Sequence, residues 1–479
     1  MVNLEALYIN LRKHLHYVYL LYAIPMVYMA ATITPPYQNP DEPNHFLRAE
    51  QVTRGIMMPV FKYDTAKLSR ADSLARNPLF SYPDRGGFSA DKGIFEAETA
   101  FVNAEQKPDV KIDLQKVKEC RKVNWGTGIV YLNFGNTAIY PPIVYLMPAL
   151  GIAIGKLFNL SILNTMSVAR VLNGALSIAM CFFALTLAKR SKVLLFIVLL
   201  FPMTIALFAS ISQDPFLISC AFLLTAIIDN VEFDENKSYS KWQIYAIIIL
   251  ISIIGVAKPP YILLGFVLLF LKLSPKIKIL SIGVPIVVLA SWLIVNHAAF
   301  MIKFAPAEMG FNPKLQVAYI IHHPFKFIGL FFNWSSKGVN FFSHMFVGVL
   351  GWLDLSFTNV YYVIAYITLF SGLIVSSGLN GYNNLKVRIV LLVAFVMTFA
   401  AILTAQYVTW TKLESTFLDG MQGRYLTPAY PFLALALSSS ITFKKMQRLK
   451  NVLFIVVLTF PIFTALNMVD GYIKRYYLR

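Results

Sequence analysis

A chain of 479 residues that is 57% hydrophobic and only 14% charged carries more apolar surface than a water-soluble core of ordinary composition can bury. The composition predicts a membrane protein whose spans are helices, because a helix satisfies its own backbone hydrogen bonds in lipid. The formal net charge of +18 does not indicate a nucleic-acid partner, since Lys and Arg lie mainly in short loops and one long hydrophilic stretch.

Apolar blocks recur along the whole chain, and a helix that crosses the hydrocarbon needs roughly 20 such residues. The blocks lie at 15–33, 138–157, 168–188, 193–210, 215–229, 242–257, 260–271, 279–297, 357–376, 387–405, 425–441 and 451–468. The first block follows Arg12 and Lys13 and is longer than the apolar part of a typical signal sequence, so we expect an uncleaved first helix.

The basic loops indicate which blocks cross the membrane. If all blocks crossed from a cytoplasmic N-terminus, the basic runs at 189–192 and 272–278 would lie outside, against the positive-inside tendency. The block at 138–157 is opened by Pro141 and interrupted by Pro148, which suits helices lying at the interface. We therefore expect this block to remain in the first loop, so that every short basic loop falls in the cytoplasm.

The predicted fold is an all-α polytopic membrane protein with about 11 transmembrane helices and a large first external loop that carries juxtamembrane helices. Its expected parts are a cytoplasmic N-terminus with the first helix at 1–33, the external loop at 34–167, and the remaining bundle at 168–479 with external loops at 298–356 and 406–424.

The strongest local motif runs from Asn39 to Arg48, directly after the first span. Asp41 can cap a helix, and Asp41, His45 and Arg48 then lie along one side of it. One interpretation is an ordinary cap with solvated charges. We favour a positioned base, because Asp41 and Glu42 are adjacent acids beside the bilayer, and base chemistry needs a carboxylate near an acceptor hydroxyl.

Three further charged residues lie at the ends of apolar blocks. Asp214 either caps the helix that starts at Pro215 or joins Asp41 at the outer mouth of the bundle. Lys258 and Arg424 fall at the outer surface, where they either anchor the chain at the interface or bind a lipid phosphate. Gly423 is expected to let the backbone approach that ligand closely.

Two other motifs carry weaker signals. Trp352 and Asp354 are typical of a membrane-belt aromatic beside a helix cap, which we favour over substrate contact. His322 and His323 lack carboxylate neighbours at ligand spacing, so the sequence predicts no metal site there. The chain has no nucleotide-binding Gly-rich loop and no serine- or zinc-hydrolase motif.

Taken in order, the motifs resemble those of a bacterial family of multi-pass membrane proteins of formerly unknown function, grouped with the GT-C glycosyltransferases. The likeness covers about Pro36 to Pro428. Its motifs are Pro40-Asp41-Glu42-Pro43-x-His45-Phe46-x-Arg48-Ala49, Tyr140-Pro141-Pro142, Ser212-x-Asp214, Lys258-x-x-Tyr261, Gly351-Trp352-Leu353-Asp354 and Gln422-Gly423-Arg424-Tyr425.

The resemblance implies a GT-C-like bundle in the bacterial inner (plasma) membrane, with a site that faces the periplasm or outside. It also implies a polyprenyl-phosphate-linked sugar as donor, an acidic residue in the first external loop, and interfacial helices packed over the site. The expected acceptor is an envelope polysaccharide such as an O-antigen, or a lipid-linked glycan, and membrane lipids are the other expected partners. No cofactor is expected, and the need for a divalent metal stays open.

We therefore expect an inverting glycosyltransferase, in which a base activates the acceptor hydroxyl and cations stabilise the leaving phosphate. The catalytic candidates are Asp41, its substitute Glu42, and His45; the donor-phosphate candidates are Lys258, Arg424, Tyr261 and Tyr425; the acceptor-binding or orienting candidates are Arg48, Asp214, Asp354 and Gln422. Two alternatives remain: a lipid-linked glycan transporter, which predicts ionisable residues at mid-span, and a non-catalytic scaffold for envelope assembly.

Overall fold

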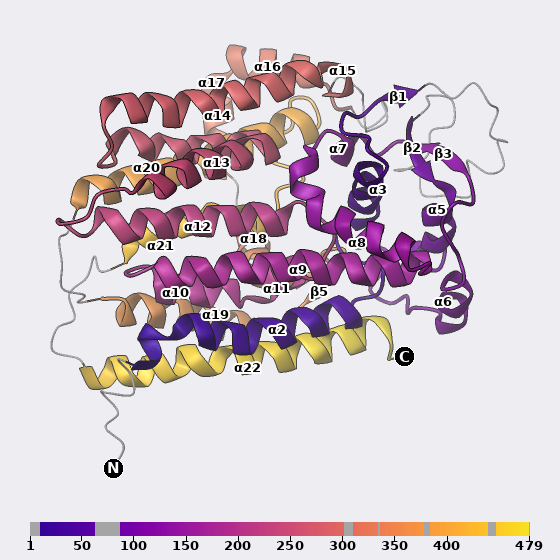
Figure 1. Ribbon diagram of the computed structural model, residues 1–479, viewed down its shortest axis with the longest axis horizontal. Coiled ribbons are helices and arrows are strands. Elements are labelled where there is room, and N and C mark those ends of the chain that lie inside the picture. Colours follow the sequence, from indigo (N-terminus) through magenta and orange to yellow (C-terminus); the bar gives the residue numbers. More distant parts are fainter. Residues whose placement is uncertain are drawn as a thin grey trace.

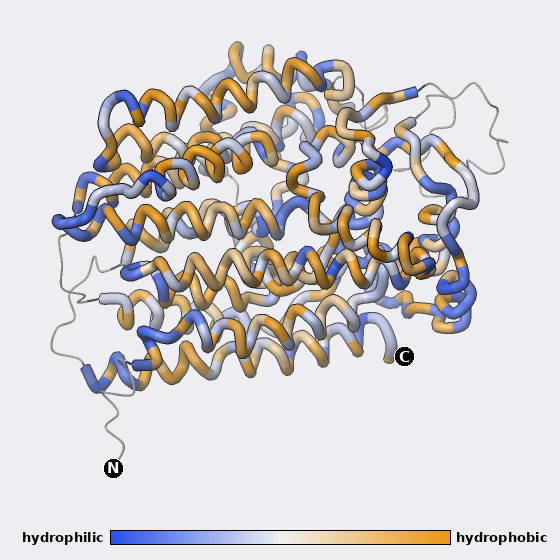
Figure 2. Tube along the Cα trace, in the orientation of Figure 1, coloured by the Kyte–Doolittle hydropathy of each residue, from blue (hydrophilic) through white to orange (hydrophobic). Residues whose placement is uncertain are grey.

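The computed structural model describes residues 10–62, 87–300, 310–333, 336–377, 384–438 and 447–478. Long helices lie side by side along the longest axis, and a group of short elements covers one end of them (Figure 1). Hydrophobic residues follow the middle of these helices, while hydrophilic residues gather toward both ends (Figure 2). Because a bilayer places an apolar core between two polar surfaces, this banding is that of a multi-pass membrane protein.

Within the described ranges, six helices are long and apolar enough to cross a membrane. They are α2 (Leu15–Ile33), α9 (Ile162–Leu187), α12 (Asp214–Glu232), α14 (Pro275–Val295), α20 (Leu385–Trp410) and α22 (Gln447–Tyr476).

Shorter helical segments complete the bundle. They are α10 (Lys192–Leu199), α11 (Pro202–Phe208), α13 (Lys241–Ala257), the 3-10 segment η3 (Pro259–Phe270), α19 (Asn359–Val375), the 3-10 turn η5 (Gly423–Leu426) and α21 (Tyr430–Leu437). The expected spans at 193–210 and 425–441 are thus each broken. In the first, Phe201 is extended because it precedes Pro202, and α11 starts anew there. Helix length alone does not fix the number of spans, so eleven stays a prediction.

The described residues of 34–62 and 87–161 form the cover seen at one end in Figure 1, which we call the sheet end. Its elements are α3 (Glu42–Thr53), β1 (Phe61–Lys62), β2 (Gly87–Asp91), α5 (Lys92–Glu98), η1 (Val102–Ala104), α6 (Leu114–Cys120), β3 (Ile129–Leu132), α7 (Gly135–Ala138), η2 (Pro142–Tyr145) and α8 (Leu146–Leu157). The strands pair antiparallel in the order β1-β2-β3, with Phe88 opposite Leu132. This small sheet was not part of the all-α expectation.

Helix α8 packs tightly against α9 through glycine. A Cβ on Gly151 would lie 2.5 Å from the Cα of Ala169, and one on Gly155 would lie 2.3 Å from Thr165 Oγ1, so only glycine fits at either position. Lys156 adds an ion pair to Glu50 of α3 at 3.0 Å. The 12 residues of α8 extend about 18 Å, less than the roughly 30 Å of bilayer hydrocarbon.

The remaining elements lie between α14 and α19 in the sequence. They are α15 (His297–Phe300), α16 (Pro313–His322), α17 (Pro324–Asn333), α18 (Ser336–Gly348), β4 (Val349–Leu350) and β5 (Leu355–Ser356). The end of α22 returns to the sheet end, where the amide of Ile112 donates to the carbonyl of Tyr476 at 3.0 Å. The expected loop at 298–356 is described apart from 301–309 and 334–335. A further short basic stretch, at 444–450, which we also expect in the cytoplasm, is described only from Gln447 onward.

One buried acid in the sheet end yields a stability prediction. Burial raises the pKa of Glu98 from 4.5 to about 7, and its Oε1 has no hydrogen-bond partner among the described residues. Because the folded pKa is raised, Glu98 costs stability as pH rises from about 4.5 to 7, by up to about 3 kcal/mol above that window. We expect Glu98→Gln to raise the melting temperature of the detergent-purified protein by several degrees at pH 8 and little at pH 5. Glu96→Gln, at a partly exposed position on the same helix, is the control, and equal shifts at both pH values would contradict the prediction.

Candidate functional site

Four charged side chains from distant parts of the chain meet at the sheet end. Arg424 Nη2 lies 3.0 Å from Asp41 Oδ2, and Arg424 Nη1 lies 3.9 Å from Asp214 Oδ2. Lys258 Nζ lies 3.8 Å from Asp214 Oδ1. We call Asp41, Asp214, Lys258 and Arg424 the charged cluster. The sequence predicted all four as candidates, and the structure brings them together.

Exposure differs sharply within the charged cluster. The side chain of Arg424 is 5% exposed and that of Asp214 is 8% exposed, whereas that of Asp41 is 39% exposed. Lys258 is intermediate at 17%. Asp41 is therefore the acid that a ligand can reach, and it lies against a guanidinium that is shielded from water.

Tyrosine rings line the two cations. Lys258 Nζ lies 4.0 Å above the ring of Tyr425, and the Arg424 guanidinium carbon lies 5.6 Å from the same ring. Tyr261 donates its hydroxyl hydrogen to the carbonyl of Tyr425 at 2.6 Å. The electron-rich face of Tyr425 favours positive charge at this point. Both tyrosines that the sequence grouped with the donor phosphate thus lie beside the cations.

Burial and neighbouring acids act in opposite directions on the cations. Burial lowers the pKa of Lys258, although Asp214 opposes this. Burial also acts against the charge of Arg424, but Tyr425, Asp214 and Asp41 outweigh it and raise the pKa of the guanidinium. Arg424 therefore stays charged at any physiological pH. Its buried Nε has no hydrogen-bond partner within the described residues, so the guanidinium keeps one unsatisfied donor.

His45 stands next to the charged cluster in its neutral form. Burial lowers its pKa to about 4, against the opposing effect of Asp41 and Asp214. Its Nδ1 lies 2.6 Å from the hydroxyl of Tyr145, and its ring stacks on Tyr140 at a centroid distance of 6.1 Å. A neutral imidazole can donate or accept a hydrogen bond without adding charge, so His45 suits an orienting role better than that of a proton acceptor.

The side chains of Asp41 and Asp214 do not cap the helices α3 and α12, although the sequence allowed both caps. Asp41 precedes α3, but its side chain caps no amide and reaches Arg424 instead. Its backbone is left-handed, with φ of 60°, a conformation that aspartate tolerates better than most residues. The N-cap of α12 is Gln213, so Asp214 is the first helical residue rather than the cap. Both carboxylates are therefore available to pair with the cations Arg424 and Lys258.

Arg48 does not converge with Asp41 and His45 as the helical spacing predicted. It is fully buried and donates to the carbonyls of Tyr140, Ile56 and Met57 at 2.8–3.3 Å. Burial lowers its pKa to about 10. Arg48 therefore links the residues around Tyr140, which we call the Tyr140 segment, to α3. This link keeps the ring of Tyr140 stacked on His45.

The Gly351–Asp354 motif holds the sheet end together. Trp352 Nε1 donates to the carbonyl of Tyr37 at 2.9 Å, just before α3. Asp354 Oδ2 pairs with Arg475 Nη2 at 2.6 Å, and Arg475 also donates to the carbonyl of Ala104. Asp354 thus lies in a separate ion pair with α22 and contacts no member of the charged cluster.

Gly423 allows a close contact with helix α18. A Cβ there would lie 2.3 Å from the carbonyl oxygen of Phe342 and the amide nitrogen of Phe346, both on α18. The glycine therefore lets η5 press against α18 and so fixes the backbone of Arg424. The neighbouring Gln422 has a buried Oε1 without a described partner, so it stays a candidate for ligand binding.

Arg170 is the residue that the sequence interpretation missed. It lies in α9, only 2% exposed, and pairs with the fully buried Glu42 at 2.5 Å. The signal was present, because a lone arginine inside the apolar block 168–188 is a rare and costly residue in a span. Glu42, expected as a substitute base, is enclosed by this contact.

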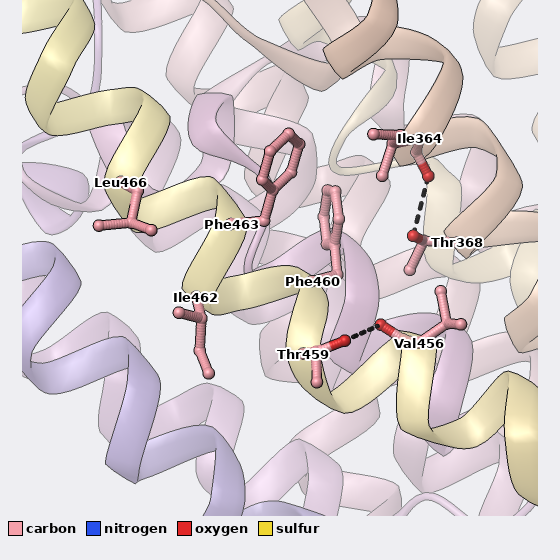
Figure 3. Close-up of a pocket in the computed structure, with 8 residues that line it drawn as sticks. All are labelled: Ile364, Thr368, Val456, Thr459, Phe460, Ile462, Phe463 and Leu466. Atoms are coloured by element: carbon pink, nitrogen blue, oxygen red, sulfur yellow. Dashed lines mark hydrogen bonds between the residues drawn. The ribbon is translucent and has the colours of Figure 1, made fainter.

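Two grooves lie away from the charged cluster. One, of about 300 Å³, runs between α19 and α22 and is lined by apolar side chains such as Phe460 and Phe463 (Figure 3). The hydroxyls of Thr368 and Thr459 donate to carbonyls of their own helices, so this groove offers mainly apolar surface. The other, of about 430 Å³, is lined by α17, Tyr407 and the following loop. Neither groove is lined by a member of the charged cluster.

Long apolar helices with one covered end define the class of this chain as a multi-pass membrane protein. Residues 26–436 match the model of a family described as predicted membrane protein (DUF2142). The chain belongs to this family, and the match includes every member of the charged cluster. No curated protein and no solved structure matches the chain.

Proposed function

We propose that this protein is an inverting glycosyltransferase that moves a sugar from a polyprenyl-phosphate carrier to a hydroxyl of a cell-envelope glycan. The observation that carries the proposal is the pairing of a reachable carboxylate, Asp41, with a shielded guanidinium, Arg424, at 3.0 Å. The reaction needs both parts: a base for the acceptor and a fixed cation for the phosphate that leaves.

The proposed step transfers the sugar directly from the phosphate oxygen to the acceptor oxygen. The acceptor hydroxyl gives its proton to Asp41 while its oxygen forms a bond to the anomeric carbon. The bond between that carbon and the phosphate oxygen breaks, and its electron pair leaves with the phosphate. Lys258 and Arg424 stabilise the growing negative charge. A phosphate leaving group needs little help from an acid, so a second catalytic carboxylate is not required.

Charge balance suggests how the donor prepares the base. The charged cluster holds two carboxylates and two cations, with His45 neutral, and is therefore formally uncharged. An incoming phosphate competes with the acids for Arg424. Asp41 is the more exposed of the two acids and is the one displaced. Donor binding would thereby release the carboxylate that serves as base, while Asp214 keeps its contact with Lys258.

The position of basic residues supports a non-cytoplasmic site. Lys192 donates to the carbonyl of Lys13, while Lys189 and Lys272 both contact Asp234, so these residues gather at the end of the bundle where α2 begins. The charged cluster lies at the opposite, sheet end. By the positive-inside tendency, the basic end faces the cytoplasm and the cluster faces the periplasm or outside.

The transporter alternative predicts ionisable residues at mid-span that face a pathway. Arg170 is a charged residue inside one of the described candidate spans, but Glu42 and three backbone carbonyls bind all of its guanidinium donors. A residue so enclosed favours a fixed framework over a moving carrier, and glycosyl transfer is the function we retain.

Deleting the gene in its native host tests the proposal. We expect a polyprenyl-linked sugar to accumulate in lipid extracts and one substituent of an envelope glycan to disappear from its composition. Wild-type protein should restore both, whereas Asp41→Asn at the same membrane level should restore neither. An unchanged glycan composition together with unchanged lipid-linked sugars would contradict the proposed function.

A further inference from the structure

Glu42 and Arg170 form a completely enclosed ion pair beneath the site. Arg170 Nε lies 2.8 Å from Glu42 Oε1, and Nη2 lies 2.5 Å from Oε2. The same guanidinium donates to the carbonyls of Ala31, Thr34 and Pro35 at 2.7–3.2 Å. The pair thus joins the end of α2, the start of α3 and the interior of α9.

Glu42 also forms a hydrogen bond with the turn that precedes Asp214. Its Oε1 accepts a hydrogen bond from the amide of Ile211 at 3.0 Å. On the other side of this turn, Asn173 of α9 donates to the carbonyls of Ser210 and Ser212 at 2.9 and 3.3 Å. Helix α9 therefore holds the turn before α12 in two ways: directly through Asn173, and indirectly through Glu42, which Arg170 binds.

The two acids of the charged cluster are attached to this same connection. Asp41 is the chain neighbour of Glu42, and Asp214 follows Ile211 by three residues. The left-handed backbone of Asp41, with φ of 60°, turns its side chain away from the ion pair and toward Arg424. Any shift of Glu42 would therefore move Asp41 and the turn before Asp214 relative to each other.

We propose that Glu42 and Arg170 are positioning residues. Their ion pair, which we call the joint, sets the separation of Asp41 from Asp214 around Arg424. Both Glu42 oxygens are occupied by Arg170, with Ile211 and Asn39 as further donors, and the side chain is fully buried. A general base must reach the proton that it removes, and Glu42 cannot do so in this arrangement. The structural part of the joint stands by itself, while its effect on turnover rests on the proposed function.

The test removes both charges together, because removing one would leave the other buried without a partner. The variant is Glu42→Gln with Arg170→Gln. The matched control is Asp354→Asn with Arg475→Gln, which removes a second buried ion pair at the sheet end that does not contact the charged cluster. Both proteins are purified in detergent and compared with wild type for melting temperature and for hydrogen–deuterium exchange.

The exchange measurement decides the structural claim without any activity. In the Glu42/Arg170 variant we expect amide exchange to accelerate at least about tenfold both in the peptide around Ile211 and in the peptide around Asp41. The control variant should leave both peptides unchanged. Unchanged exchange at Ile211 in the Glu42/Arg170 variant would overturn the proposed positioning role of this ion pair.

The kinetic measurement decides the functional claim. With a polyprenyl-phosphate sugar as donor, we expect kcat of the Glu42/Arg170 variant to fall at least about tenfold, because misplacing a reacting group is costly, while KM for the donor changes less than threefold. The acid limb of the pH profile should persist, since the proposed base Asp41 is still present. An unchanged kcat would reduce the pair to a structural role, and a vanished acid limb would make Glu42 the base. If wild-type protein transfers no sugar, the proposed function fails while the exchange result still stands.

Discussion

Arg424→Lys is expected to lower use of a polyprenyl-phosphate sugar by about 10- to 100-fold. Lysine keeps the charge but loses the planar fork, and charged hydrogen bonds contribute roughly 1.5 to 3 kcal/mol each. Arg424 meets Asp41 and Asp214 with two different nitrogens and has a third, Nε, without a described partner. A single ammonium cannot serve these directions at once, so the phosphate should lose contacts in the transition state.

The measurement is transfer by purified protein at matched amounts over a range of donor concentrations. Arg121→Lys, at an exposed position after α6, is the control for the same chemical change. Equal rates for Arg424→Lys and wild type would remove Arg424 from the phosphate site and leave Lys258 as the remaining cation of the charged cluster. A fall in melting temperature that matches the loss of activity would instead indicate a defect of folding.

Asp41→Asn is expected to reduce turnover by about 10²-fold or more while the protein still inserts and folds. The amide has the shape of the acid but cannot take a proton at neutral pH. Asparagine also tolerates the left-handed backbone found at Asp41, and the side chain makes no cap bond that the change could break. The loss should therefore fall on kcat, with melting temperature close to that of wild type.

The exposed Asp470→Asn, which alters a surface ion pair with Lys474, provides the matched control and should keep wild-type turnover. Turnover of Asp41→Asn within a few-fold of wild type would exclude Asp41 as the base. If Glu42→Gln then caused the larger loss and abolished the acid limb of the pH profile, the base would be Glu42.

Local sequence rules account for where the candidate residues lie but less well for what they contact. Helical spacing placed Asp41, His45 and Arg48 on one side of α3, and the structure does place His45 near Asp41. Arg48 departs because carbonyls from the Tyr140 segment lie within reach of its guanidinium. The cap rule similarly assigned Asp41 to an amide, yet a buried guanidinium from η5 is a stronger partner for a carboxylate.

The sequence by itself determined the class of protein, because apolar blocks of membrane length leave a chain no water-soluble alternative. It also pointed to Asp41, Asp214, Lys258 and Arg424, since charged residues at the ends of such blocks stand out against their surroundings. Only the tertiary structure decided that these four form one cluster and that Glu42 belongs to Arg170. A charged side chain excluded from water takes whichever partner the packed helices bring within about 3 Å, and those partners come from segments far apart in the chain.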